Sequence, residues 1–376
     1  MTSDRYYPFP DYDATVASIL GPRIAGRRTE VEDGLLAYRL PVAFEYRHHL
    51  LLRGFEGTLA RFRPDIVHVY QAFTLPTLQA ALAKKRLGFG LVVSSSMERE
   101  VFYPQSAGRR GYYWIYGALG GLLLRRRVDA FTAVGVGARD IVTRVLGLTA
   151  EQVAVFPLGA DSERFQFDAV ARARVRSELG VGDDLVLAIY AGKLIPRKDV
   201  HVLLEALHQL NSHARVGVLL VGNGTPAYGA HLREIAQTAP APVFFRPAVP
   251  NSELPRYFSA SDIGVWPSES SNAAIEAVLV GLPLVVSASD ATEHYMAHNS
   301  GLSFARGNRK ALARCLEQLA RTPESRRGMG ARGREYARAH LTWEVAALRT
   351  LRLYETIIAS HNRARVRYSS GAGLPT

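Results

Sequence analysis

Short runs of apolar residues alternate with longer amphipathic segments along most of the chain. Residues 65–70 (DIVHVY), 185–190 (LVLAIY) and 216–221 (VGVLLV) are such runs, each of strand length and with few polar positions. A run that is apolar at consecutive positions is typical of a strand buried on both faces, as in parallel sheets. Strands that alternate with helices in this way predict an α/β fold with right-handed crossovers.

The rhythm of strands and helices stops after Phe156 and then starts again, which predicts two successive doubly wound units joined over residues 157–182. Predicted strands cover residues 35–41, 65–70, 90–94, 130–134, 153–156, 185–190, 216–221, 243–245, 263–266 and 284–286. Predicted helices cover residues 49–62, 75–86, 112–127, 138–146, 200–210, 229–237, 254–259, 272–280, 309–321, 324–340 and 343–360.

These elements define the expected domains. We assign residues 1–157 to a first unit, together with a C-terminal helix at about 344–360, and residues 158–343 to a second unit. The remaining residues, 361–376, are basic and then rich in Gly and Ser, which predicts a mobile tail.

Length and composition are those of a globular protein of enzyme size. The chain has 376 residues, of which 48% are hydrophobic and 21% charged. Its longest uncharged apolar stretch, residues 111–124, is shorter than the ~20 residues that cross a bilayer. No basic and then apolar segment follows Met1, and Cys315 is the only cysteine, which excludes internal disulfides. We therefore expect a cytoplasmic protein.

The charge balance favours anionic partners. There are 46 basic and 34 acidic residues, and 41 of the basic ones are arginines. This excess has two interpretations. The arginines are spread over solvated faces, or those beside the apolar helix at 112–127, namely Arg109, Arg110 and residues 125–127, contact the surface of an anionic membrane.

Polar and glycine residues collect where predicted strands of the second unit end, which is the edge at which parallel sheets bind ligands. The strand 185–190 leads into Gly192, Lys193 and Lys198. A glycine allows close approach of the backbone and two lysines supply positive charge, so this segment predicts a cradle for a diphosphate. The alternative is a surface loop with solvated cations.

Two further strand ends carry candidate residues. The strand 216–221 ends in a tight turn that contains Gly222 and Gly224. The strand 263–266 is followed by a polar turn and a helix beginning near Asn272, whose first amides face the strand ends. Glu276 lies one turn into that helix in a mostly apolar segment, so its carboxylate needs a partner, either the two hydroxyls of a ribose or an arginine.

Other cofactor motifs do not fit. Residues 135–140 begin like a dinucleotide fingerprint, but Asp140 stands where the third glycine belongs. The chain contains no phosphate-binding G-x-x-x-x-G-K-[ST] sequence, no G-x-S-x-G elbow and no H-E-x-x-H helix. The 11 histidines show no ligand spacing beyond the adjacent His48 and His49, which are more often surface residues, so the sequence gives no positive support for a metal-dependent mechanism.

Taken together in order, these segments resemble the conserved blocks of family-4 retaining glycosyltransferases, which have the GT-B fold of two Rossmann-like domains facing a cleft. The resemblance extends over nearly the whole chain. The matching blocks are residues 156–165 (FPLGADSERF), 191–199 (AGKLIPRKD), 219–224 (LLVGNG), 249–254 (VPNSEL), 261–268 (SDIGVWPS), 267–286 (PSESSNAAIEAVLVGLPLVV) and 341–344 (LTWE).

The resemblance implies roles for individual residues. Lys193 stands where the family usually has a phosphate-binding arginine, and Lys198 matches the lysine that contacts the donor diphosphate. Glu276 matches the second glutamate of the family's E-x7-E motif and is expected to hold the ribose. The remaining expected donor contacts are made by Gly192, Gly222, Gly224 and the amides near Asn272, Ala273 and Ala274.

The chain departs from the family pattern at three places. Ser268 stands eight residues before Glu276, so we take Glu269 as the carboxylate that orients the sugar. The first domain lacks the usual histidine after its strand 91–93, and Ser96 is assigned its place. The usual first strand and Gly-rich loop have no counterpart before residues 2–41. Either the true start lies upstream, or we expect a first domain that is incomplete at its N-terminus, with apolar neighbours of a missing central strand exposed.

The resemblance implies a retaining hexosyltransferase that moves sugar from a UDP- or GDP-sugar to a lipid-linked, lipid or small polar acceptor. It needs no metal or further cofactor, and no nucleic acid partner is expected. It would work in the cytoplasm, with peripheral contact to the inner face of the membrane. The alternatives are a nucleotide-sugar-binding protein or partner subunit without turnover, and a nucleotide-sugar epimerase of the same two-domain shape.

Overall fold

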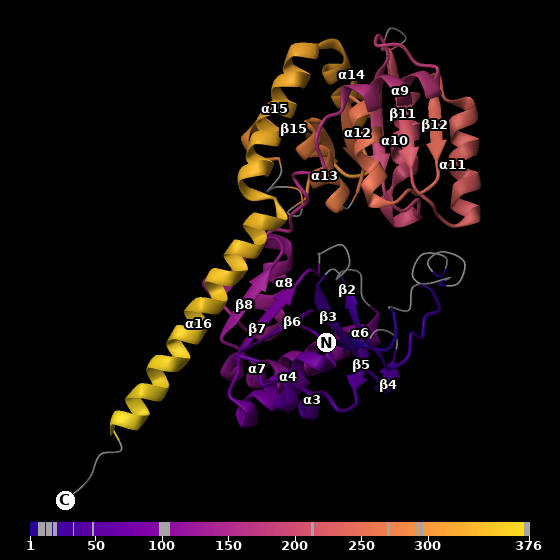
Figure 1. The fold of residues 1–376 in the computed structure, drawn as a ribbon. Helices are drawn as coiled ribbons and strands as arrows, with labels where there is room; N and C mark the ends of the chain where they lie inside the picture. Colours follow the sequence, from indigo (N-terminus) through magenta and orange to yellow (C-terminus); the bar gives the residue numbers. More distant parts are fainter. Residues whose placement is uncertain are drawn as a thin grey trace, which may run out of the picture. The chain divides into compact units, whose positions relative to one another are not determined.

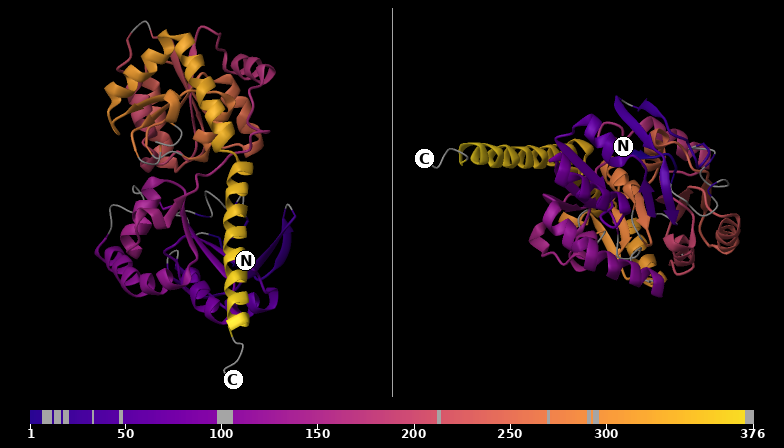
Figure 2. Two further views of the ribbon diagram at one scale, coloured as in Figure 1. Left: turned by 90° about the vertical axis from the view of Figure 1, so that its left-hand side faces the viewer. Right: turned by 90° about the horizontal axis from the view of Figure 1, so that it is seen from below.

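A computed structural model describes residues 1–371 except 7–11, 13–16, 18–20, 33, 47–48, 98–105, 212–213, 269–270, 290–291 and 293–295. The chain forms two compact units (Figures 1 and 2). The first consists of residues 1–156 and 348–376, and the second of residues 157–347. The α/β fold with two Rossmann-like units agrees with the expectation from the sequence.

The second unit is built on one parallel sheet of six strands in the order β12-β11-β10-β13-β14-β15. Every residue of β10, β11, β13 and β14 is buried, as the consecutive apolar runs predict. The chain order reverses beside β10, which makes the carboxyl ends of β10 and β13 the topological switch point of the sheet. The strands are β10 (Val186–Ala191), β11 (Val216–Val221), β12 (Val243–Arg246), β13 (Ile263–Trp266), β14 (Leu284–Ser287) and β15 (Gly301–Phe304).

Helices cover this sheet and fill its core. The most buried of them is α13, because residues 274–280 are all buried and Trp266 of the preceding strand is 1% exposed. The helices are α9 (Ala169–Leu179), α10 (Val200–Leu207), α11 (Pro226–Thr238), α12 (Leu254–Ala260), α13 (Asn272–Val280), α14 (Arg309–Arg321) and α15 (Pro323–His340).

Helix α9 lies in the segment that the sequence pattern treats as a connection, and that interpretation was wrong. The helix is held by two arginines rather than by a continuous apolar face. Arg172 donates to the carbonyls of Ser259, Ala260 and Ser261 at 3.1–3.3 Å, and Arg176, 3% exposed, pairs with Asp262 at 3.2 Å. These charge-assisted bonds explain why apolar periodicity did not predict it.

The first unit contains a parallel sheet of four strands in the order β6-β7-β8-β9. Its strands are β6 (Ile66–Tyr70), β7 (Gly90–Ser95), β8 (Ala130–Ala133) and β9 (Val153–Val155). Its helices are α3 (Phe55–Phe62), α4 (Leu75–Leu87), α6 (Ala107–Ile115), α7 (Gly121–Arg127) and α8 (Val136–Leu146), with a π-helical turn, η1 (Tyr116–Gly120), between α6 and α7.

The long C-terminal helix α16 (Trp343–Gly371) begins in the second unit and joins the first from Leu348 onward. Tyr354 Oη lies 2.6 Å from Nδ1 of His68 on β6, and His361 Nε2 lies 3.1 Å from an Asp129 carboxylate oxygen. Burial lowers the pKa of His68, so a neutral imidazole lies between Tyr354 and Ser94. The helix passes residue 360, where we expected it to end, because neither Gly nor Pro interrupts it before Gly371.

The N-terminal residues form two small sheets beside the parallel one. Strand β3 (Leu35–Leu40) pairs in parallel with β1 (Thr2–Ser3) and antiparallel with β2 (Thr29–Glu32). Strands β4 (Val42–Tyr46) and β5 (His49–Leu52) form an antiparallel pair. The predicted helix over 49–62 was therefore wrong over residues 49–54, because residues 49–52 form β5 and α3 begins only after Gly54, which has φ 73°.

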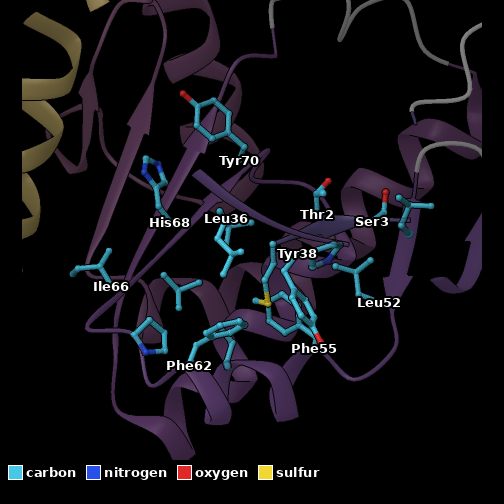
Figure 3. A pocket seen from close by; sticks show the side chains of 17 residues that line it. Thr2, Ser3, Leu36, Tyr38, Leu52, Phe55, Phe62, Ile66, His68 and Tyr70 are labelled. Carbon is cyan, nitrogen blue, oxygen red and sulfur yellow. The ribbon is translucent and has the colours of Figure 1, made fainter. Parts of the chain in front are cut away.

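A cavity of about 560 Å³ lies between β1, β3, β5, α3 and β6 (Figure 3). The described residues that line it include no Asp, Glu, Lys or Arg; Leu36, Tyr38, Phe62 and Ile66 are among them. Within the described chain β6 pairs with β7 alone, so its other edge is unpaired and borders this cavity. Apolar side chains therefore lie beside this open strand edge, and the incomplete first domain stays a prediction.

Candidate functional site

The loops that follow β10 and β11 run side by side at the carboxyl edge of the second sheet. The Gly192 amide donates to the Val221 carbonyl at 3.0 Å, and the Leu194 amide donates to the Asn223 carbonyl at 2.9 Å. A parallel bridge joins Leu194 to Gly224. The two predicted glycine segments are therefore brought together and extend the strand pairing beyond the sheet.

Two of the predicted donor-binding glycines are required by this close approach. A Cβ atom on Gly222 would lie 1.9 Å from the Gly192 oxygen, and one on Gly224 would lie 1.7 Å from the Leu194 oxygen. Gly222 and Gly192 also have φ values of 158° and 150°. The pairing of the loops thus explains these glycines before any ligand is considered, and their contact with a donor stays a prediction.

The two predicted lysines lie on the same loop. Lys193 is exposed, whereas Lys198 is half-buried at the end of a 3-10 turn, η3 (Pro196–Lys198). Asp199 follows with φ 52° and begins α10, and the Arg306 guanidinium pairs with its carboxylate at 2.7 Å. This corner fixes the backbone of the loop that carries the candidate phosphate-binding charges.

The same loop is fastened to the turn after β13. Ser268 is 2% exposed, and its hydroxyl donates to the Arg197 carbonyl at 3.0 Å. The Ser287 hydroxyl at the end of β14 in turn donates to the Ser268 carbonyl at 3.0 Å. Ser268, which stands eight residues before Glu276, therefore joins three strand ends. Glu269, the predicted sugar-orienting carboxylate, lies outside the described residues.

Helix α13 begins at Asn272 as predicted, after the N-cap Ser271. Among its first amides, that of Ala274 donates to the Ser271 carbonyl at 2.8 Å, so the chain itself already uses one of the three predicted donors. Asn272 and Ala273 are half-buried at the start of the helix. The helix terminus stays a predicted contact for the sugar or its phosphate.

Glu276 lies one turn further on and is 8% exposed. Its Oε1 accepts a hydrogen bond of 2.9 Å from Asn251 Nδ2, and Asn251 Oδ1 accepts one of 3.0 Å from Arg164. Burial raises the pKa of Glu276, and the Asn251 hydrogen bond and the Arg164 charge oppose that rise. The arginine that the sequence offered as an alternative partner therefore acts through an amide rather than in a direct ion pair.

Asn251 and Arg164 are functional candidates that the sequence pattern did not single out. Both fall within matching blocks, VPNSEL and FPLGADSERF, but neither has a spacing that connects it to Glu276. Asn251 opens a 3-10 turn, η4 (Asn251–Glu253), and Arg164 lies in the loop before α9. Only the fold brings the three segments together.

Ser96 belongs to the first unit and follows β7. Its hydroxyl accepts a hydrogen bond of 2.7 Å from Gln71 Nε2 at the end of β6. Gln71 has φ 76°, and its Oε1 atom is buried with no partner among the described residues. The structure thus places Ser96 at the carboxyl edge of the first sheet, beside Gln71, a residue whose backbone is strained.

The described residues contain no group of three or more His, Cys, Asp and Glu side chains able to hold a metal ion. Among the described helices, none is long and apolar enough to cross a bilayer. The site therefore consists of lysines, backbone amides, one buried carboxylate and its amide partner.

Comparison with known families gives two matches. The sequence model described as "Glycosyl transferases group 1" matches residues 171–336, and that described as "Glycosyl transferase 4-like domain" matches residues 11–159. The first match falls within the second unit, the second match falls in the first unit except for its last three residues, and together they cover most of the chain.

Individual relatives have related descriptions. A "D-inositol 3-phosphate glycosyltransferase" of Streptomyces griseus is 30% identical over 232 residues, which are 58% of this chain and 49% of that protein. A "GDP-mannose-dependent alpha-(1-6)-phosphatidylinositol monomannoside mannosyltransferase" of Mycolicibacterium smegmatis is 27% identical over 209 residues, which are 52% of this chain and 54% of that protein. The chain spans about half of the length of these relatives.

Solved structures share the fold. The Anabaena protein HepE, in complex with UDP, has a TM-score of 0.65 at 16% identity, covering 84% of this chain and 82% of its own. Sucrose-phosphate synthase of Thermosynechococcus elongatus has a TM-score of 0.68 at 20% identity, covering 96% of this chain and 89% of its own.

Proposed function

The chain belongs to the group 1, family-4-like glycosyltransferases with the GT-B fold, and on that basis we propose that it transfers a sugar from a nucleoside-diphosphate sugar to a hydroxyl of an acceptor with retention of configuration. A UDP- or GDP-sugar is the proposed donor. One relative is described as GDP-mannose-dependent and one structural neighbour was crystallised with UDP, which supports this donor class without choosing the base.

One observation carries the proposal. At the switch point of the second sheet, the loop of Lys193 and Lys198, the start of α13 and the Glu276 carboxylate all lie at the ends of neighbouring strands β10 and β13. In this arrangement the lysines and helix amides take the diphosphate, and Glu276 takes the ribose hydroxyls. Ser268 links two of these strand ends directly.

The proposed chemistry relies on charge stabilisation. The bond from the sugar to the diphosphate breaks, and negative charge grows on the departing diphosphate, where lysine ammoniums and backbone amides stabilise it. Glu269 is proposed to orient the sugar, and Ser96 stands where the family usually has a histidine. No metal is needed in this scheme, because the positive charge comes from the protein.

The proposed acceptor is a lipid-linked, lipid or small polar molecule with a free hydroxyl. The relatives are described as acting on D-inositol 3-phosphate and on a phosphatidylinositol monomannoside. An inositol phosphate and a phosphoinositide are therefore the first acceptors to test.

Contact with an anionic membrane is part of the proposal. The segment 107–127 presents Trp114 and Leu119, each 75% exposed, together with Ile115 and Leu122 on one side of the helix. Exposed Arg110 and Arg126 lie at its two ends. An exposed apolar stripe between basic residues fits the interface of an acidic bilayer. The cytoplasmic location stays a prediction.

A panel experiment tests the proposed function. The purified chain is incubated with UDP- and GDP-sugars and with inositol phosphates or phosphoinositides, with and without EDTA. We expect binding by calorimetry, transfer of sugar, an unchanged anomeric configuration by NMR and no effect of EDTA. Binding without hydrolysis or transfer would instead support the alternative of a nucleotide-sugar-binding protein without turnover, which the departure at Ser96 favours.

A further inference from the structure

A chain of polar side chains leads from the surface of the second unit to the buried Glu276. Asp161 Oδ1 accepts the amides of Glu163 and Arg164 at 3.1 and 2.9 Å, and its other oxygen pairs with the Arg164 guanidinium at 3.4 Å. Arg164 donates to Asn251, and Asn251 donates to Glu276. Two separate segments, the loop of Asp161 and Arg164 and the turn of Asn251, therefore act on one carboxylate.

We propose that Asn251 and Arg164 are positioning residues, which hold one oxygen of the Glu276 carboxylate and direct the other at the ribose hydroxyls of the donor. This inference rests on the proposed function and adds to it the residues that set the ribose contact.

The direction of the Asn251 amide is set by Arg164. A guanidinium only donates hydrogen bonds, so the atom of Asn251 that faces Arg164 has to be the oxygen, and the NH2 group then faces Glu276. The opposite orientation would place an oxygen against the carboxylate and an NH2 group against the arginine. Arg164 thus fixes the donor of the Glu276 hydrogen bond without touching the carboxylate.

An amide partner leaves one carboxylate oxygen of Glu276 available for a ligand, whereas an arginine that binds both oxygens would not. A guanidinium commonly binds both oxygens of a carboxylate. Asn251 binds Oε1 alone, and no hydrogen bond reaches Oε2 from the described part of the chain. Glu276 is 8% exposed and accepts one hydrogen bond from the described residues, so its carboxylate can accept further donors, which a pair of ribose hydroxyls supplies.

Isosteric replacement of the amide tests this inference. Asn251→Asp keeps the shape but removes the donor, and its carboxylate repels Glu276 and pairs with Arg164. The probes are UDP and GDP and their 2′,3′-dideoxy forms, with affinities measured by calorimetry. We expect the unmodified chain to bind the ribose form at least tenfold more tightly than the dideoxy form, and Asn251→Asp to reduce that ratio to about two or less.

Two further variants separate positioning from folding. Arg164→Ala removes the group that fixes the amide from a position where it is 46% exposed, and we expect a reduced ribose ratio with an unchanged melting temperature. Asn308→Asp is the matched control, because Asn308 caps α14 by accepting from the Ala311 amide, a role that Asp also performs. It should keep the full ratio.

The pH dependence gives an independent readout. Without the hydrogen bond from Asn251, the pKa of Glu276 rises further. As the pH is lowered, Glu276 of Asn251→Ala is therefore protonated at a higher pH than in the unmodified chain, and ribose-specific binding should be lost there. An unchanged ribose ratio and pH profile in Asn251→Asp, Asn251→Ala and Arg164→Ala would overturn the inference. Absence of nucleotide binding in the unmodified chain would instead refute the proposed function on which it rests.

Discussion

The hydroxyl of Ser268 donates a hydrogen bond of 3.0 Å to the carbonyl of Arg197, and this bond joins the turn before α13 to the loop that carries Lys198. The buried hydroxyl of Ser268 therefore links the loop of Lys198 to the segment that leads into α13, the helix of Glu276. Their relative position depends on packing within the second unit alone, which makes the site testable by point substitutions there.

Lys198→Ala should reduce kcat/KM for the donor at least tenfold, or roughly 1.4 kcal/mol, because it removes a charge that stabilises the departing diphosphate. Steady-state kinetics with varied nucleotide-sugar measure this. Lys310→Ala is the control, since Lys310 is an exposed residue at the start of α14. Equal activity of both variants would remove Lys198 from the phosphate site.

Gly224→Ala should destabilise the second unit by about 1–3 kcal/mol, because the new Cβ would lie 1.7 Å from the Leu194 oxygen and would force the paired loops apart. Donor affinity should fall with it. Gly229→Ala is the matched control inside α11, where the nearest atom to the new Cβ is the end of Arg233 at 3.6 Å. That change should stabilise the chain by up to about 1 kcal/mol. Denaturant unfolding distinguishes the two, and similar unfolding of both variants would contradict the loop pairing.

Glu276→Gln should raise stability at neutral pH while it lowers donor affinity. Burial raises the folded-state pKa of Glu276 above its ordinary value, so the carboxyl favours folding when protonated and this contribution is lost as pH rises through the raised pKa. A neutral Gln avoids that loss. Melting temperatures should therefore differ at pH 7.5 in favour of the variant and converge below the ordinary pKa of a glutamate. A variant less stable than the parent at pH 7.5 would mean that the Asn251 and Arg164 interactions outweigh burial.

Trp114→Ser combined with Leu119→Ser should weaken co-sedimentation with vesicles of phosphatidylglycerol and phosphatidylcholine at least fivefold, because it removes the apolar side chains that enter the interface. Leu82→Ser is the control, since Leu82 is 59% exposed on α4, outside this stripe. Binding should also fall as salt rises. Sedimentation that ignores both acidic lipid and salt would rule out the membrane contact.

Apolar patterning predicted the four central strands of the second unit, β10, β11, β13 and β14, well, because every residue of these strands is buried; β11 and β13 match their predicted limits. The same patterning did not predict elements that depend on polar contacts or on a turn rather than on apolar burial. The α9 helix depends on Arg172 and Arg176, and β5 is a short hairpin strand ended by Gly54. Strand β15, which was also missed, is partly exposed at the edge of its sheet.

The candidate site divides in the same way. Lys198 and Glu276 could be proposed from the sequence, because Lys198 lies in the segment after one predicted strand and Glu276 in the helix after another; their roles stay predictions. Asn251 could not be proposed, because its contact with Glu276 joins segments 25 residues apart and depends on how η4 packs against α13. Sequence order predicts which residues reach the edge of a sheet, but the partner of a buried carboxylate depends on tertiary packing.

The division of α16 between the units has a consequence for synthesis on the ribosome. Residues 157–347 form a unit from one continuous stretch, whereas the first unit needs Tyr354 and His361 to reach His68 and Asp129. The second unit is synthesised after residues 1–156, but its sequence is complete once residue 347 has emerged. The first unit can be completed only after α16 has emerged as well. Until then, the nascent first unit lacks its hydrogen bonds to α16 at His68 and Asp129.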